Sequence, residues 1–382
     1  MANTCMMSYL WADPETGHMD FSALADQYSE PVLAAFGALV IGVMFGAFAQ
    51  KSRFCLRAAA VDFSRGNLTG KVAVWLLVFG TALAFTQLLS LTDLLNTKEA
   101  RQLASPQSLS GAALGGLLFG SGMVLARGCA SRLLVLSATG NLRALLSGLV
   151  FAVVAQASLH GFLSPLRNAI AGTLTSNAAG GNDLLEFTGL STAGAILFSL
   201  LWFAAGTWFA WRNRTSLLVA AAAVVTGLTI PLAWWYTAQL SAIAFEPVQM
   251  TSLTFTGPSA KTLMHFLEAT DLDFDVGLVP GVFLGSFLAA ALSGELKLQG
   301  WNGGHSMRRY IAGAAMMGFG GMLAGGCAVG AGITGGSVFA LTAWVTLGAM
   351  WLAAGVTDRL FDYGVEVGQV PAKDAGTELV GA

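Results

Sequence analysis

The sequence predicts an all-α polytopic membrane protein with about nine transmembrane helices and several short re-entrant helices. Of its 382 residues, 55% are hydrophobic and only 10% are charged, whereas roughly 25% of residues are charged in soluble domains. Apolar runs near the ~20 residues needed to cross a bilayer recur along most of the chain. A glycine-rich motif that contains one cysteine follows several of these runs. Together these observations predict spanning helices that are interrupted by shorter ones.

The chain divides into three predicted parts. Residues 1–31 form an exposed N-terminal tail that is acidic and contains no Lys or Arg, and residues 357–382 form a C-terminal tail. Residues 32–356 form the membrane transport domain, which contains the repeats around Cys55, Cys129 and Cys327. The predicted spans are residues 32–50, 72–92, 110–126, 142–163, 192–211, 216–236, 277–293, 310–324 and 337–355.

The basic residues predict an orientation for these spans. Of the 19 Lys and Arg, 15 lie in the C-terminal tail and in the loops after the first, third, fifth and seventh spans. Basic residues favour the cytoplasmic side, so we expect the N-terminus outside and the C-terminus in the cytoplasm. The connections 93–109, 164–191 and 237–276 then face outward. The last of these is acidic, which is unexpected beside a path for anions.

The cysteine motifs are repeats of one pattern. The strongest copy, residues 318–336, reads GFGGMLAGGCAVGAGITGG and contains Cys327, and residues 120–130 around Cys129 match it closely. A weaker copy ends at Cys55, and a degenerate fourth copy without a cysteine begins at Val279. Glycine permits a backbone to leave helical geometry, and irregular backbone inside a membrane lines cavities. Because the Cys129 and Cys327 motifs follow spans of opposite direction, they predict inverted repeats that form a transport site.

The residues around the cysteines favour a path for an anion. No His, Asp or Glu adjoins Cys129 or Cys327 to act as a base, and no ligand spacing for a metal is present. The N-termini of short helices carry partial positive charge, which suits an anion. Arg53 and Arg127, together with Arg57 and Arg132, lie two or three residues from cysteines. These arginines either orient the anion or anchor the protein at the cytoplasmic surface, and the cysteines alternatively serve only to pack the core.

Other classes of function receive little support. The net charge of −2 gives no reason to expect nucleic acid as a partner, and the four histidines are scattered. No ATP-binding motif is present, and we predict no cofactor and no metal. Asp62 follows the first motif, and we expect it to form a salt bridge with Arg57 or Arg65 in preference to relaying protons.

The three motifs resemble those of the YeeE/YedE family of sulfur-transport membrane proteins. The resemblance is carried by Ser52-Arg-Phe-Cys55 with Asp62, by Arg127-Gly-Cys129-Ala-Ser-Arg with Gly140-Asn-Leu142, and by Gly325-Gly-Cys327-Ala-Val-Gly-Ala-Gly-Ile-Thr-Gly335, and it covers about residues 32–356. It implies an hourglass-shaped bacterial inner-membrane protein with inverted repeats that takes up thiosulfate. Carried over to this sequence, it implies that Cys55, Cys129 and Cys327 relay thiosulfate through S–H···S hydrogen bonds. It further implies that the motif glycines Gly128, Gly326, Gly330 and Gly332 hold the short helices.

The sequence thus predicts a transporter and not an enzyme, whose partners are thiosulfate, the lipid bilayer and, through the resemblance, a cytosolic sulfur-carrier protein. Two alternatives stay open. One is a transporter for a selenium compound or another sulfur compound. The other is a membrane sulfurtransferase in which Cys129 or Cys327 carries a persulfide.

Overall fold

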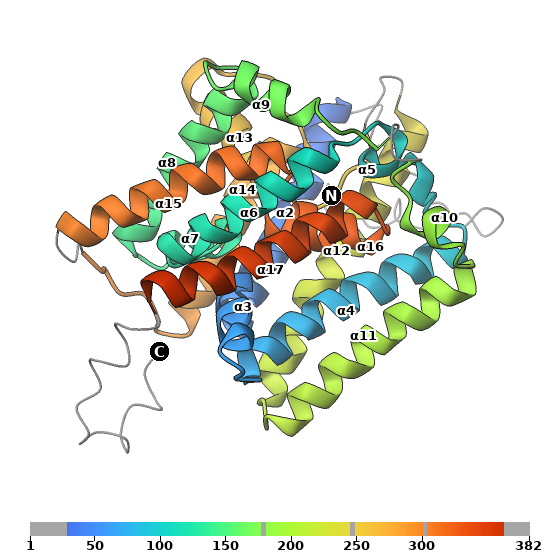
Figure 1. Ribbon diagram of the computed structural model, residues 1–382, viewed down its shortest axis with the longest axis horizontal. Coiled ribbons are helices and arrows are strands. Elements are labelled where there is room, and N and C mark those ends of the chain that lie inside the picture. The colour runs from blue at the N-terminus through green and yellow to red at the C-terminus, as the bar shows by residue number, and fades with distance from the viewer. Residues whose placement is uncertain (1–28, 177–180, 245–248, 301–303, 363–382) are drawn as a thin grey trace, which may run out of the picture.

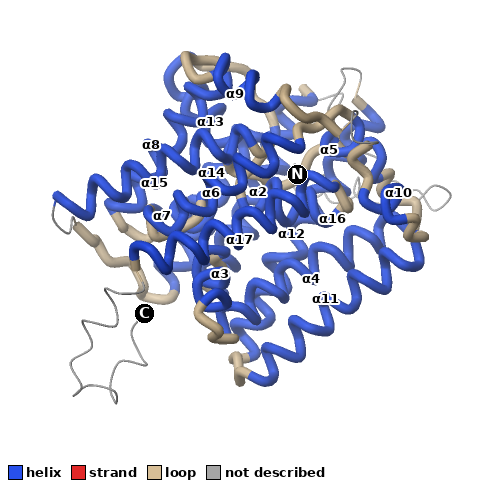
Figure 2. Tube along the Cα trace, in the orientation of Figure 1, coloured by secondary structure: helices blue, strands red, loops and turns tan. Residues whose placement is uncertain are grey.

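The computed structural model describes residues 29–176, 181–244, 249–300 and 304–362, and every regular element in these residues is helical (Figures 1 and 2). The long helices are α2 (Glu30–Ser52), α4 (Gly70–Leu91), α6 (Leu109–Leu125), α8 (Leu142–Leu159), α11 (Thr192–Arg212), α12 (Leu217–Ile243), α14 (Phe274–Leu292), α15 (Gly304–Leu323) and α17 (Leu341–Phe361). The shorter elements are α3 (Leu56–Ser64), η1 (Thr97–Glu99), α5 (Arg101–Ala104), α7 (Ala130–Ala138), α9 (Ser164–Ala171), α10 (Leu184–Thr188), α13 (Thr256–Glu268), η2 (Ala328–Thr334) and α16 (Gly335–Ser337).

The nine long helices coincide with the nine predicted spans, which confirms an all-α, multi-pass membrane fold. Within the described part of the chain, eight helical segments are long and apolar enough to cross a membrane. The remaining long helix, α17, is not among the eight, and its last turns contain Asp358 and Arg359. It also continues to Phe361, beyond the predicted end of its span at residue 355.

Glycines permit the central helices to approach one another closely. A Cβ at Gly42 of α2 would lie 2.6 Å from the carbonyl oxygen of Leu278 in α14, and α14 presents its own glycines to α2. In the same way Gly122 of α6 faces Gly313 of α15, and a Cβ on either would lie 2.6 Å from the other's backbone oxygen. Small residues at such crossings bring helix backbones together in membranes.

Each half of the chain contains the same set of helices, and the same pairs of helices pack together when each helix is replaced by its counterpart in the other half. The unit α2–α3–α4 corresponds to α12–α13–α14, and the unit α6–α7–α8 corresponds to α15–η2–α17. Thus α2 packs on α14 as α12 packs on α4, and α8 packs on α15 as α17 packs on α6. Corresponding helices run in opposite directions: near the start of α2 the backbone oxygen of Leu33 accepts a hydrogen bond of 2.6 Å from Tyr236, near the end of α12. This arrangement is an inverted repeat.

The predicted fourth copy of the motif at Val279 was wrongly placed. Helix α14 is continuous from Phe274 to Leu292, with Pro280 inside it. The fourth short helix is α13, which Phe255 precedes. It was missed because the residues that lead into α13 contain neither a cysteine nor a glycine-rich motif.

The predicted tails lie almost entirely outside the described residues, which begin at residue 29 and end at residue 362. In Figure 1 the short helices α9, α10 and α13 lie toward the upper and right edges of the molecule, whereas α3 and the end of α17 lie toward the lower left. The short elements thus gather at two opposite ends of the helix bundle.

Candidate functional site

The same turn precedes each of the three cysteines. In each turn the residue two positions before the cysteine has a positive φ, which is 54° at Arg53, 56° at Arg127 and 78° at Gly325. The N–H of the next residue donates to the carbonyl six positions before the cysteine, at 3.2, 3.0 and 2.8 Å respectively. This pattern is a Schellman-type helix end, so the sequence repeat is also a repeat of backbone geometry.

The turn places each cysteine at the start of a short helix. Cys55, Cys129 and Cys327 are the N-cap residues of α3, α7 and η2. The first N–H groups of a helix have no partner within it, and in η2 the N–H of Gly330 donates to the Cys327 sulfur at 3.5 Å. Each thiol therefore lies where backbone N–H groups and the helix dipole favour negative charge.

Cys55 and Cys129 form a pair. Their side chains interact directly, and the Cys129 sulfur lies 3.5 Å from the hydroxyl of Ser131. Cys129 is buried and Cys55 is partly buried. The pair follows the ends of α2 and α6, and we call this end of the bundle the double-thiol end. The guanidinium of Arg132, in the first turn of α7, is close to both sulfurs.

Cys327 lies at the other end, buried beneath a tight backbone contact. The side chain of Thr254 and the backbone of Phe255 lie beside its sulfur. A Cβ at Gly330 would lie only 2.1 Å from the Thr254 hydroxyl oxygen, and a Cβ at Gly326 would lie 2.7 Å from the nitrogen of Ala331. Glycine is therefore required at both positions for η2 to close over Cys327.

The correspondence between the two halves gives four equivalent positions, of which three hold a cysteine. Cys129 corresponds to Cys327, and Cys55, the N-cap of α3, corresponds to Phe255, which precedes α13. The side chain of Cys55 lies against Cys129, and the backbone of Phe255 lies against Cys327. The fourth position of the repeat is thus occupied by an aromatic residue, and its ring packs at a tilt of 43° against Phe45 of α2, with 5.2 Å between the centroids.

A cavity of about 470 Å³ extends as far as Gly326, the residue before Cys327. Its walls come from the starts of α2, α13 and α14 and the ends of α8 and α15, together with Thr254, Gly325 and Gly326 beside the cysteine. Three cations line it, namely Arg101, Arg167 and Lys261. We call it the vestibule. It lies at the end of the bundle opposite the double-thiol end, because α2 begins beside it and ends next to Cys55.

The acidic residues of the vestibule have a specific partner. Asp273 and Asp275 bind the Lys261 ammonium at 2.7 and 2.9 Å. Burial acts to lower the pKa of Lys261, but the charges and hydrogen bonds of Asp275 and Asp273 outweigh it and raise that pKa. Arg101 and Arg167 form no ion pair with a carboxylate in the described ranges. The lining thus contains three carboxylates, the third being Glu30, against three cations, and Arg101 and Arg167 are the cations that no carboxylate of the described ranges binds.

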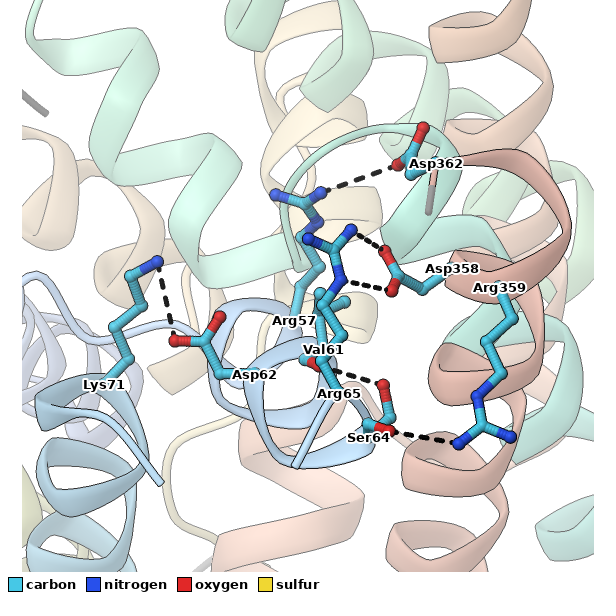
Figure 3. Close-up of polar contacts among 9 residues, drawn as sticks. All are labelled: Arg57, Val61, Asp62, Ser64, Arg65, Lys71, Asp358, Arg359 and Asp362. Atoms are coloured by element: carbon cyan, nitrogen blue, oxygen red, sulfur yellow. Dashed lines mark hydrogen bonds and ion pairs between the residues drawn. The ribbon is translucent and has the colours of Figure 1, made fainter. Parts of the chain in front are cut away.

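Ion pairs at the double-thiol end fasten α3, the helix that begins after Cys55, to α17 (Figure 3). Arg65 binds Asp358 through two hydrogen bonds of 2.7 and 2.8 Å, and Arg57 lies 3.7 Å from Asp362. Asp62 instead accepts from Thr69 at 2.5 Å and lies 3.6 Å from Lys71. The expected salt bridge of Asp62 with Arg57 or Arg65 was therefore wrong, because both arginines take carboxylates from α17.

The remaining predicted site residues lie in the turns themselves. Arg53 and Arg127 are exposed, and they hold the left-handed turn position that Gly325 holds in the third copy. Gly128 and Gly332 are less tightly enclosed than Gly326 and Gly330: a Cβ at either would lie 3.2 Å from a leucine side chain. Whether these residues contact a substrate stays a prediction.

Several residues of these sites were not selected from the sequence. Thr254 and Phe255 lie in a segment with no glycine or cysteine signal, and Arg101 and Arg167 lie in connections remote from the motifs. Arg132 does adjoin a motif, but its sequence distance from Cys129 did not distinguish it from the other arginines. No cluster of three or more potential metal ligands occurs in the part of the chain that the structure describes.

Comparison with known proteins adds a family and two named relatives. Residues 51–356 match the family described as sulphur transport. A thiosulfate transporter TsuA from Spirochaeta thermophila is 29% identical over 332 residues, which cover 80% of this chain and 93% of the relative. A thiosulfate transporter TsuA from Escherichia coli is 25% identical over 336 residues, which cover 81% of this chain and 89% of the relative.

Proposed function

Because the chain belongs to the sulphur-transport family, we propose that it takes up thiosulfate across a bacterial inner membrane. The observation that carries the proposal is the repetition of one thiol turn three times, with the turn of Cys327 below a vestibule that contains Arg101 and Arg167. The names of the two TsuA relatives, which match most of their length, support thiosulfate as the substrate. On this proposal the protein is a transporter and not an enzyme.

The chemistry of thiosulfate suits the two kinds of group along this path. Thiosulfate is a dianion with hard sulfonate oxygens and one soft terminal sulfur. Arg101 and Arg167 attract the anion to the vestibule, and the helix N-terminus at Cys327 stabilises its charge. Each neutral thiol donates a weak S–H hydrogen bond to the terminal sulfur. Because such bonds are weak, the ion leaves each thiol readily, as transport requires.

The order of the thiols follows from the two ends of the bundle. The ion meets Cys327 below the vestibule and then passes to Cys129 and Cys55 at the double-thiol end. The excess of basic residues in alternate loops supports an N-terminus outside and a cytoplasmic C-terminus. The vestibule then opens outward and the double-thiol end faces the cytoplasm. A cytosolic sulfur-carrier protein would receive the sulfur there.

The division of the chain follows from the same proposal. Residues 32–356 form the transport domain, residues 1–31 an external tail, and residues 357–382 a cytoplasmic tail. The ion pairs of α17 with α3 place the start of that C-terminal segment against the helix that begins after Cys55.

The direct contact between Cys55 and Cys129 favours one alternative, a sulfurtransferase. In that reaction a Cys129 thiolate attacks the terminal sulfur of thiosulfate, the sulfur–sulfur bond breaks with its electron pair on sulfite, and a Cys129 persulfide remains. The persulfide sulfur then passes to Cys55. A mass increase of one sulfur atom on either isolated cysteine would favour this reaction over transport of the intact ion.

The test is growth on thiosulfate in a bacterial host that lacks its own sulfate and thiosulfate importers. Wild type would be compared with Cys129→Ala and Cys327→Ala at matched expression, and Cys5→Ala serves as a control outside the repeats. We expect growth with wild type and Cys5→Ala and none with the other two variants. Growth with all four would discard the thiol relay, and no growth with wild type would discard thiosulfate as the substrate.

A further inference from the structure

Arg132 differs from the other arginines near the cysteines. It is the third residue of α7, its side chain is partly buried, and its guanidinium is close to the sulfurs of both Cys55 and Cys129. Its own backbone N–H lies beside the Cys129 thiol. Side chain and backbone of one residue therefore converge on the thiol pair.

The charge of Arg132 has no carboxylate partner in the described ranges. Its guanidinium donates to the side-chain oxygen Oε1 of Gln50 at 3.5 Å. Glu295 is the acid that could reach it, but Glu295 instead accepts a 2.9 Å hydrogen bond from the Gln50 amide. Gln50 is 7% exposed. A buried neutral amide thus stands between the cation and the carboxylate.

Other arginines at this end of the bundle are paired with carboxylates, unlike Arg132. Arg57, Arg65 and Arg309 each bind Asp358 or Asp362 at the same end of the bundle. A charge inside a membrane protein is costly unless it is paired or serves a substrate path. Arg132 carries that cost beside two thiols at the start of a helix, which is a setting suited to a ligand that is itself an anion.

We propose that Arg132 binds the charged oxygens of a divalent sulfur oxyanion whose terminal sulfur contacts Cys55 and Cys129, and that Gln50 keeps this cation available by holding Glu295 away from it. The inference rests on the proposed function and assigns its second binding site. The planar guanidinium offers parallel N–H donors that match two oxygens of a sulfonate group. The thiols then contact the soft end of the same ion, so the site recognises both ends.

Transport kinetics provide the first test. Arg132→Gln is expected to raise the apparent KM for thiosulfate uptake by about tenfold or more, the effect of losing one charged hydrogen-bonding partner. Arg132→Lys keeps the charge and is expected to recover part of the affinity. Arg143→Gln is the matched control, because Arg143 is also partly buried but contacts the Tyr310 ring, not a cysteine. An unchanged KM in Arg132→Gln would overturn the proposal.

A swap of two side chains tests the role of Gln50. The double variant Gln50→Glu/Glu295→Gln has the same composition and net charge as wild type, but it places the carboxylate directly against Arg132. We expect its KM to rise as in Arg132→Gln, although Arg132 is still present, while the thermal unfolding temperature is maintained by the new ion pair. A KM like that of wild type in this folded variant would show that the charge of Arg132 is not used.

A third measurement does not depend on transport. In a Cys5→Ala/Cys327→Ala background, the remaining thiols would be modified with an anionic and a cationic methanethiosulfonate reagent of similar size. With Arg132 present the anionic reagent should react faster, and Arg132→Gln should lower the ratio of the two rates by about tenfold. A ratio that Arg132→Gln does not change would refute an anion site. If wild type fails to take up thiosulfate, the proposed function fails, but this ratio still decides whether Arg132 attracts anions to the thiols.

Discussion

The fit between Gly330 and Thr254 allows a prediction that can be worked out from the structure. In Gly330→Ala the new Cβ would lie 2.1 Å from the Thr254 hydroxyl oxygen and 2.5 Å from the Thr254 Cβ. Both groups belong to backbone-anchored positions in a buried region, so neither can swing away. Overpacking of this kind costs about 1–3 kcal/mol. We expect Gly330→Ala to unfold at lower temperature in detergent and to lose thiosulfate uptake, because η2 holds Cys327.

A second substitution, at Thr254, tests whether this clash is the cause. Thr254→Gly removes the obstructing atoms, and the Thr254 Cα would still lie 3.1 Å from the new Cβ, so the double variant should recover most of the loss. Gly148→Ala is the matched control, since a Cβ there meets nothing within 4 Å and Gly148 lies inside α8; it should stabilise the protein by up to about 1 kcal/mol. If Gly330→Ala and Thr254→Gly were additive, the proposed clash would be refuted.

Two further predictions concern the double-thiol end. Arg127→Gly should stabilise the protein by about 1 kcal/mol, since the φ of 56° at Arg127 costs an L-residue roughly that much; a chemical unfolding curve shifted toward lower denaturant would contradict this. Burial acts to raise the pKa of Asp362, but the hydrogen bond and charge of Arg309, with the charges of Arg127 and Arg57, hold that pKa below its usual range. Because the folded-state pKa is depressed, the stabilisation is fully present above about pH 4 and is lost as pH falls below it. Asp362→Asn should therefore unfold at lower temperature than wild type at pH 7, and its unfolding temperature should fall less on acidification below pH 4. Equal unfolding temperatures of the two proteins at pH 7 would show that the carboxylate is not stabilising.

The sequence was informative wherever composition alone determines the structure. Runs such as residues 72–92 must be helical in lipid because their backbone groups can be satisfied only within the segment, so the position of α4 followed directly. The strongest cysteine motif was recognisable because close packing excludes a side chain at Gly326 and Gly330, which keeps this stretch rich in glycine.

Other features depended on contacts that the sequence does not display. α13 occupies the fourth position of the repeat, yet Thr254 and Phe255 lack the residues by which the other copies were found. Arg53, Arg127 and Arg132 all lie two or three residues from a cysteine along the chain. The structure distinguishes them, because Arg53 and Arg127 are exposed in the turns, whereas Arg132 lies inside α7 with its charge near both thiols. Asp62 could not be assigned its partner, because its competitors come from α17, almost 300 residues later.

Phe255 makes the two halves of the protein chemically unequal. At one end a cysteine pairs with a cysteine, and at the other the equivalent neighbour is a phenylalanine, which has no thiol. On the proposed function, an ion would find one soft donor after entering and two before leaving. Its dwell time would then be longest at the exit, and the slowest step would be departure into the cytoplasm. Net flux would accordingly be governed by how quickly cytosolic chemistry removes the ion, and not by the concentration outside.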